Sequence, residues 1–178
     1  MTRTLPLALF LLASPAVAGD HFPDAGKMAP CPAAIHYAPE DNLEAIDVSV
    51  IDSAREKIDM ATYVLTSIPV IEALTRAADR GVTVRLYRDG GARRAPKRLR
   101  EAFDALFSRP SVAVKYKKSP APFMHLKAYA VDGRVLREGA GNFTHSGLIR
   151  QDNSLVILAC EAAAKAFETK FESMWRRK

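Results

Sequence analysis

Residues 125–132 read HLKAYAVD, an HxKxxxxD pattern, and the glycine-rich segment GAGN follows at 139–142. Alternate side chains of a β-strand share a face, so His125 and Lys127 are expected to converge on one point. A histidine can attack phosphorus and form a covalent intermediate, and a lysine can neutralise phosphate oxygens. The amide of Asn142 can add hydrogen-bond donors after the turn. This set of groups predicts cleavage of a phosphodiester without a metal or another cofactor.

The pattern resembles that of the phospholipase D superfamily, most closely its small bacterial endonuclease branch with a single HxKxxxxD motif. The resemblance extends to IDSAREKIDMATYVLTSIPVIEALTRAADRGVTVRLYRDG at 51–90 and to GNFTHSGLIRQDNSLVIL at 141–158. It covers roughly residues 33–175. The chain departs from the family at Ala140, where a serine is usual, so one hydroxyl near the phosphate is missing.

The resemblance implies a role for each motif residue. His125 would be the nucleophile, and Lys127 and Asn142 would bind the substrate phosphate. Asp132 belongs to the catalytic motif, with a mainly structural role, and its place in an Asp-Gly turn would by itself explain it. Asp152 aligns with an acidic residue that orients the nucleophilic histidine and fixes its tautomer.

The first residues have the organisation of a secretory signal peptide. A positive residue precedes an apolar run too short for a comfortable membrane span, and Ala16-Val17-Ala18 forms a small-residue cleavage site. We expect a signal peptide at 1–18, an irregular leader at 19–32 and one phospholipase D-like nuclease domain at 33–178. The protein would then be periplasmic or secreted, without stable membrane insertion after cleavage; a retained anchor is the alternative.

The composition indicates which kind of partner the protein binds and in which redox environment it works. The formal net charge of +6 suits a polyanion such as nucleic acid or an anionic lipid surface. The two cysteines, Cys31 and Cys160, would form a disulfide in an oxidising compartment, which could stabilise the fold by roughly 4–5 kcal/mol. Two unrelated thiols are the alternative.

Hydrophobic periodicity predicts an α/β protein in which a mixed β-sheet is flanked by helices. The expected strands are 33–37, 58–64, 82–88, 112–116, 125–131, 134–137 and 154–158. The expected helices are 43–54, 67–81, 93–107 and 161–175. Asp132-Gly133 predicts a tight hairpin turn between two of the strands.

The single motif has a consequence for assembly. One histidine must attack and a second group must protonate the leaving oxygen, so a homodimer with a shared active site is expected.

The function expected is an exported, metal-independent endonuclease that cleaves DNA or RNA through a phosphohistidine. A phospholipase D-type lipid phosphodiesterase and a weakly active or non-catalytic nucleic-acid-binding module are the alternatives. Basic runs flank the motif and could be solvated faces or could track a nucleic-acid backbone: Arg93, Arg94, Lys97, Arg98, Arg100, Lys115, Lys117 and Lys118.

Overall fold

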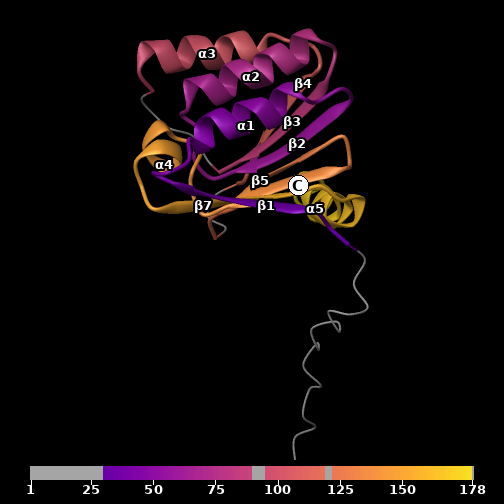
Figure 1. Cartoon of the computed structure of the whole chain (residues 1–178). Coiled ribbons are helices and arrows are strands. Elements are labelled where there is room, and N and C mark those ends of the chain that lie inside the picture. Colours follow the sequence, from indigo (N-terminus) through magenta and orange to yellow (C-terminus); the bar gives the residue numbers. More distant parts are fainter. Residues whose placement is uncertain (1–29, 90–94, 119–121, 178) are drawn as a thin grey trace, which may run out of the picture. The chain divides into compact units, whose positions relative to one another are not determined.

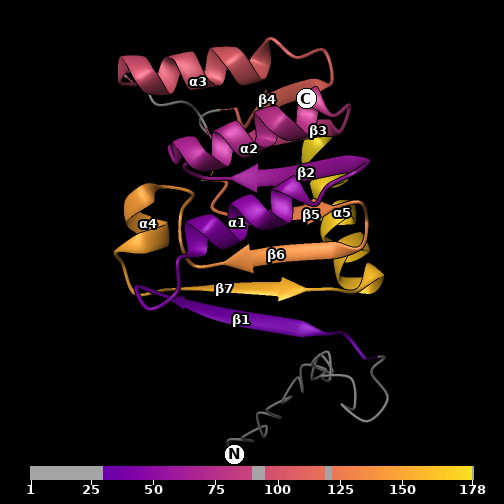
Figure 2. The ribbon, with the colours of Figure 1, turned by 45° about the horizontal axis from the view of Figure 1, so that its top comes forward.

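The computed structural model describes residues 30–89, 95–118 and 122–177. The expected signal peptide and most of the leader lie outside the described residues. The domain from Cys31 onward is built on a seven-stranded sheet with the strand order β1-β7-β6-β5-β2-β3-β4 (Figures 1 and 2). The strands are β1 (Ala33–Ala38), β2 (Lys57–Thr62), β3 (Thr83–Arg88), β4 (Val112–Tyr116), β5 (Lys127–Val131), β6 (Val135–Gly139) and β7 (Asn153–Leu158). The mixed α/β fold expected from the sequence is confirmed.

The sheet has a parallel half and an antiparallel half that meet at β2. Strands β2, β3 and β4 are parallel, because helices connect them, whereas β5, β6, β7 and β1 pair antiparallel in succession. The β5–β6 turn has positive φ at both Asp132 and Gly133, as the Asp-Gly pair predicts for a tight hairpin.

The longer helices cover both faces of the sheet. Helices α1 (Leu43–Asp52), α2 (Ile68–Asp79) and α3 (Lys97–Phe107) lie on one face and α5 (Glu161–Trp175) on the other (Figure 1). Asn42 and Ser67 cap α1 and α2 by accepting hydrogen bonds from backbone N–H groups three residues ahead. The short α4 (His145–Ile149) follows β6 at one end of the sheet, and the sequence did not predict it.

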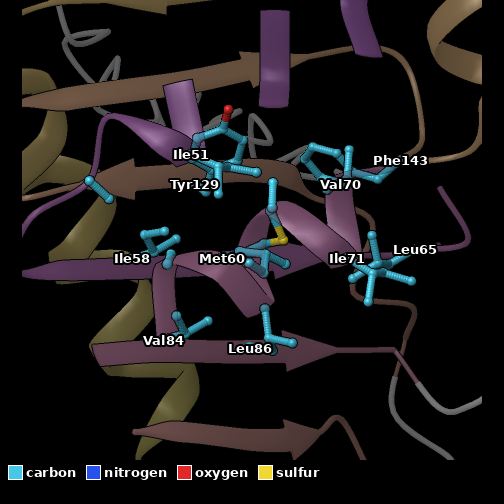
Figure 3. Close-up of a cluster of buried hydrophobic side chains, with 14 of the residues drawn as sticks. Ile51, Ile58, Met60, Leu65, Val70, Ile71, Val84, Leu86, Tyr129 and Phe143 are labelled. Atoms are coloured by element: carbon cyan, nitrogen blue, oxygen red, sulfur yellow. The ribbon is translucent and has the colours of Figure 1, made fainter. Parts of the chain in front are cut away.

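Each face of the sheet has its own apolar layer. Figure 3 shows the larger layer, where side chains of β2, β3 and β5 pack against α1 and α2. Its members include Ile51, Ile58, Met60, Ile71, Val84, Leu86 and Tyr129. The smaller layer packs under α5 and includes Ala61, Tyr87, Ala128, Phe167 and Phe171. Strand β5 is therefore buried on both sides, which leaves its ends as the places where polar side chains can reach solvent.

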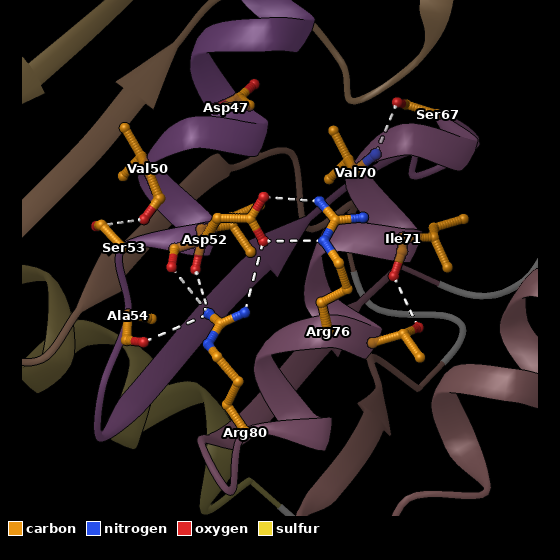
Figure 4. A network of polar contacts seen from close by, with 12 residues as sticks. Asp47, Val50, Asp52, Ser53, Ala54, Ser67, Val70, Ile71, Arg76 and Arg80 are labelled. Atoms are coloured by element: carbon orange, nitrogen blue, oxygen red, sulfur yellow. Dashed lines mark hydrogen bonds and ion pairs between the residues drawn. The ribbon is translucent and has the colours of Figure 1, made fainter.

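Charged residues tie α1 to α2. The Asp52 carboxylate accepts hydrogen bonds from Arg76 at 2.7 and 3.2 Å, and Arg80 donates to the Asp52 carbonyl at 3.0 Å (Figure 4). These groups are partly exposed, so each pair contributes little free energy, on the order of 0.5 kcal/mol. Their role is to fix the relative position of the two helices at the surface.

The predicted disulfide between Cys31 and Cys160 is present, with Cα atoms 5.3 Å apart. It joins Cys31, two residues before β1, to Cys160, the residue immediately before α5. A disulfide fits an oxidising compartment. None of the helices in the described part of the chain combines the length and hydropathy that crossing a bilayer requires.

Of the element boundaries that differ from the sequence prediction, two bear on the site. Strand β5 begins at Lys127 rather than at His125, because its partner β2 ends at Thr62, directly opposite Lys127. Helix α3 begins at Lys97 rather than Arg93, because Pro96 is extended and the residue before a proline disfavours helical dihedrals. Residues 93 and 94 themselves lie outside the described ranges.

Candidate active site

The topology brings His125, Lys127 and Asn142 to one edge of the sheet. The parallel strand β2 ends at this edge with Thr62, and the antiparallel β5 begins there with Lys127. Strand β6 ends there with Gly139, opposite Leu155 near the start of β7. We call this end of the sheet the catalytic edge; β2 and β6 point toward it in Figure 2, on the side where α4 lies. Ligand sites commonly form beyond the carboxyl ends of parallel strands.

His125 and Lys127 are in direct contact at the catalytic edge. The Lys127 Nζ lies 2.9 Å from His125 Nδ1 and 3.3 Å from Nε2, and it donates to the His125 carbonyl at 2.8 Å. The imidazole is exposed, whereas Lys127 is 7% exposed. The two groups therefore converge as the i, i+2 spacing predicts, although His125 lies just before the strand rather than in it.

Both ring nitrogens of His125 lie within hydrogen-bond distance of the Lys127 Nζ. An ammonium has only donors, so whichever nitrogen it contacts acts as an acceptor. A nitrogen that carries a lone pair is the one that can attack an electrophile.

The aromatic ring of Tyr63 packs against the imidazole. The Tyr63 ring lies 4.6 Å from the His125 ring, centroid to centroid, and the Lys127 Nζ lies 5.6 Å from the Tyr63 centroid. Tyr63 follows β2, and its N–H donates to the Leu126 carbonyl at 3.0 Å. The sequence prediction missed Tyr63, because a single tyrosine after a buried strand carries no motif. Tyr63 restricts the rotamers of both His125 and Lys127.

Partial burial has an electrostatic consequence for Lys127. Desolvation lowers the pKa of its ammonium below the ordinary value of 10.5. If Lys127 binds the substrate phosphate, as the motif predicts, only its charged form contributes, and kcat/KM should fall as the pH rises through this lowered pKa. The pKa of Lys127 in the free enzyme is measured from the alkaline limb of the pH profile of kcat/KM. A Lys127→Arg variant should be slower but lose that limb; an unchanged limb would contradict the assignment to Lys127.

Asn142 lies beside the same edge, in the loop between β6 and α4. Its Oδ1 is buried without a hydrogen-bond partner among the described residues, which is unusual for a buried polar atom. The loop is tightly packed, since a Cβ at Gly141 would lie 2.8 Å from the Gly147 carbonyl oxygen. Ala140 is exposed, and its N–H donates to the Ser154 carbonyl at 3.1 Å.

Asp132 lies at the opposite edge. It directly follows β5, roughly 16 Å along the chain from Lys127. Its carboxylate accepts hydrogen bonds from the backbone N–H groups of Arg55, Glu56 and Lys57 at 2.8–2.9 Å. These bonds lower the pKa of the Asp132 carboxyl against the opposing effect of burial. Asp132 thus fastens the β5–β6 turn to the start of β2, a position that fits the mainly structural role expected for it.

Asp152 lies at the catalytic edge, immediately before β7, and is exposed. The hydrogen bonds and ion pairs of the described residues include none between Asp152 and His125. The neighbouring Asn153 donates to the Gly147 carbonyl at 2.8 Å, which fixes the start of β7 against α4. Asp152 is thus on the correct side of the sheet for its expected role, but in this state the partner of the imidazole is Lys127.

A buried ion pair between Arg137 and Asp47 contacts the backbone of Lys127. The Arg137 guanidinium donates to both oxygens of Asp47 at 2.7 and 2.8 Å, and it donates to the Lys127 carbonyl at 2.8 Å. Asp47 and Arg137 are both fully buried. Burial raises the pKa of the Asp47 carboxyl, and the adjacent Arg137 charge opposes that shift. Arg137 thereby holds the backbone of Lys127, a role that no local sequence pattern indicates.

The described residues contain no group of three or more His, Cys, Asp and Glu side chains arranged to hold a metal ion. Among the described residues, the side chains at the catalytic edge offer an imidazole, an ammonium, an amide and the carboxylate of Asp152.

Comparison with known proteins places these features in a family. A family model described as "Cardiolipin synthase, PLD-like domain" matches residues 48–175. The chain is 23% identical over 126 residues to a mitochondrial cardiolipin hydrolase of Chlamydomonas reinhardtii, covering 70% of this chain and 54% of that protein. It is 22% identical over 162 residues to the Danio rerio protein of the same name, covering 91% and 69%. The chain thus spans about half the length of the first of these relatives.

Solved structures share the fold. A phospholipase D family member, Nuc from Salmonella typhimurium, superposes with a TM-score of 0.72 at 24% identity, covering 82% of this chain and 95% of that one. NucT from Helicobacter pylori gives a TM-score of 0.70 at 19% identity, covering 82% and 96%. At these identities the likeness concerns the architecture of the sheet and its helices.

Proposed function

This chain belongs to the PLD-like domain family of the phospholipase D superfamily, and from that membership we propose that it is a phosphodiesterase that uses His125 as its nucleophile. The observation that carries the proposal is the contact between His125 and Lys127, 2.9 Å apart at an accessible edge of a rigid sheet. An imidazole there can attack phosphorus, and an ammonium there can stabilise the charge that develops on the phosphoryl oxygens.

The reaction would proceed in two displacements. In the first, a His125 nitrogen forms a bond to phosphorus while the bond from phosphorus to the leaving oxygen breaks, and that oxygen takes a proton from a second imidazole. In the second, the second imidazole accepts a proton from water, the water oxygen bonds to phosphorus, and the phosphorus–nitrogen bond breaks. Lys127 and the amide of Asn142 would bind the phosphoryl oxygens in both displacements.

We propose that the second imidazole is His125 of another copy of this chain. The described residues place one imidazole, His125, in contact with Lys127, while His145 lies in α4 facing Glu44, 3.6 Å from its carboxylate. A twofold axis at the catalytic edge would bring the two His125 side chains together and would supply a second Lys127 and a second Asn142.

The proposed substrate is nucleic acid, cleaved without the participation of a metal. The basic net charge of +6 supports a polyanionic substrate. A lipid phosphodiester is the second candidate, and it is favoured by the relatives named mitochondrial cardiolipin hydrolase. The disulfide between Cys31 and Cys160 supports an exported protein that acts in an oxidising compartment.

The test is hydrolysis by the purified protein of single-stranded DNA, RNA, duplex DNA and cardiolipin in vesicles, each with and without EDTA. We expect cleavage of at least one nucleic acid, unaffected by EDTA, because every proposed step uses side chains of this chain. Cleavage of cardiolipin alone would support the second candidate. Loss of activity in EDTA would contradict the proposed mechanism.

The same assay, repeated at decreasing protein concentration with sedimentation in parallel, tests the shared site. Specific activity should fall where the dimer dissociates, because each monomer would lack the proton donor. A sedimenting monomer with full specific activity would contradict the shared site and leave the nucleophile assignment intact.

A further inference from the structure

Thr62 is the last residue of β2, and its side chain lies beside that of Lys127. The two residues face each other in the antiparallel β2–β5 ladder. Because the adjacent Tyr63 N–H donates to the Leu126 carbonyl, Thr62 and Lys127 form a pair without mutual hydrogen bonds. Side chains of such a pair are the closer ones, with Cβ atoms about 4.5–5.5 Å apart. The Thr62 hydroxyl is therefore within reach of the flexible lysine side chain.

The Thr62 hydroxyl is buried and has no hydrogen-bond partner in the described part of the chain. Buried polar atoms are nearly always paired, and an unpaired one costs free energy of folding. On the other side of Thr62, its partner in β3 is Arg88. The Arg88 guanidinium is held against the rings of Phe103 and Tyr116, 4.3 and 5.7 Å from their centroids. Lys127 is therefore the neighbouring cation that is free to change partner.

The contact between Lys127 and His125 occupies a lone pair that the mechanism needs. The Lys127 Nζ lies 2.9 and 3.3 Å from the two ring nitrogens. A neutral imidazole has one nitrogen lone pair, and an N–H that points at it keeps it from attacking phosphorus. The ammonium must therefore leave the ring before the first displacement. Its N–H groups then need other acceptors, because Lys127 is almost fully buried and unpaired donors are costly there.

The other flank of Lys127 offers no hydroxyl. Pairing of β5 with β6 places Gly139 beside Lys127, and Ala140 follows it. In the proposed mechanism the amide of Asn142 binds the phosphate. Within its own row of the sheet, the Thr62 hydroxyl is therefore the side-chain acceptor left for the Lys127 ammonium.

We propose that Lys127 has two positions and that Thr62 holds the second. In the resting position the ammonium contacts His125, as observed. In the engaged position it donates one hydrogen bond to the Thr62 hydroxyl and others to the phosphoryl oxygens, while the imidazole lone pair is free to attack. Thr62 is then a positioning residue, since it acts through Lys127 and does not touch the substrate. This inference rests on the proposed phosphodiesterase function and adds the step that frees its nucleophile.

Three substitutions test the role of Thr62. Thr62→Val removes the hydroxyl and keeps the β-branched shape, whereas Thr62→Ser keeps the hydroxyl. Thr75→Val is the control on α2, where the hydroxyl donates to the Ile71 carbonyl. On the substrate that the parent cleaves, Thr62→Val should lower kcat/KM by roughly 10- to 100-fold, as expected for a lost hydrogen bond to a charged group. Thr62→Ser should recover most of this loss, and Thr75→Val should match the parent.

The pH profiles distinguish positioning from packing. The alkaline limb of kcat/KM reports Lys127 in the free enzyme, where it rests on His125, and the limb of kcat reports it in the substrate complex. A hydroxyl that accepts from the ammonium favours the charged form, so its loss should lower the pKa of Lys127 only in the complex. Thr62→Val should therefore shift the limb of kcat to lower pH and leave that of kcat/KM in place. Limbs that move together, or that both stay, would overturn the proposal.

The stability of Thr62→Val provides a second distinction. Because the hydroxyl is buried without a partner, its removal should leave the free energy of unfolding in urea equal to or above that of the parent. A packing role would instead lower stability and activity together. That result would overturn the proposal, as would a failure of Thr62→Ser to recover activity.

Binding of inorganic phosphate tests the engaged position without catalysis. Phosphate should draw Lys127 away from His125, which NMR signals of the imidazole report, and Thr62→Val should bind phosphate about fivefold more weakly than the parent. If no diester is hydrolysed but this difference is found, the proposed function fails while the two positions of Lys127 stand. Equal phosphate affinities would overturn the two positions, even with His125 established as the nucleophile.

Discussion

Replacing His125 by alanine should lower the rate of diester cleavage by roughly 10⁴-fold or more, the scale observed when a covalent nucleophile is removed. The expected cause is loss of the attacking nitrogen, because no other imidazole of the described residues contacts Lys127. The side chain is exposed and precedes β5, so the fold should tolerate the change. The measurement is the single-turnover rate on the preferred substrate, with the folded state verified by circular dichroism.

His145→Ala is the matched control. His145 lies near the motif in sequence, and its side chain is 58% exposed, but it faces Glu44 on α1 rather than Lys127. Its removal should leave the rate within a few-fold of the parent. An acid-labile phosphoryl group should be trapped on the parent protein and on His145→Ala but not on His125→Ala. Cleavage by His125→Ala near the parent rate would remove the basis of the assignment.

Replacing Arg137 by methionine should destabilise the protein by about 3–5 kcal/mol, because it leaves the Asp47 carboxylate buried without its partner. The bidentate contact between these residues is fully buried, and Tyr129 donates to the same carboxylate at 2.9 Å. The substitution also leaves the Lys127 carbonyl without its donor, so the remaining folded protein should be less active. Urea denaturation measures the free energy of unfolding.

The double variant Asp47→Leu/Arg137→Met separates the cost of a lone buried charge from the cost of lost packing. Buried ion pairs can often be replaced by apolar residues of similar volume without loss of stability. The double variant should therefore regain much of the stability lost by Arg137→Met, while its activity stays low because Lys127 remains unsupported. A double variant that is less stable than Arg137→Met would show that the pair itself contributes net stability.

The sequence was most informative where the determining interactions are local. The bounds of α5 match the prediction, because the apolar spacing of Ala164, Phe167, Phe171 and Met174 specifies one buried face. The turn at Asp132-Gly133 and the cap at Ser67 also follow from neighbouring residues. His125 and Lys127 meet because they are two residues apart on one extended segment.

The features that the sequence did not indicate depend on contacts between distant segments. Arg137 and Asp47 are 90 residues apart, and each looks like an ordinary surface charge in the sequence. Strand β5 starts at Lys127 because a different strand ends opposite it. The three backbone N–H groups that the Asp132 carboxylate holds lie 75–77 residues earlier in the chain. Such contacts become visible only once the order of strands in the sheet is known.

The position of the disulfide determines how this domain could be attached to anything else. Cys31 and Cys160 lie where β1 begins and β7 has ended, which is the edge of the sheet opposite His125. The covalent bond holds that exit point in place even under load on the N-terminal side. A tag, a bead or a neighbouring domain joined ahead of Cys31 would therefore pull on the rear of the domain and leave the catalytic edge facing outward. For immobilisation, attachment on the N-terminal side of Cys31 is therefore preferable.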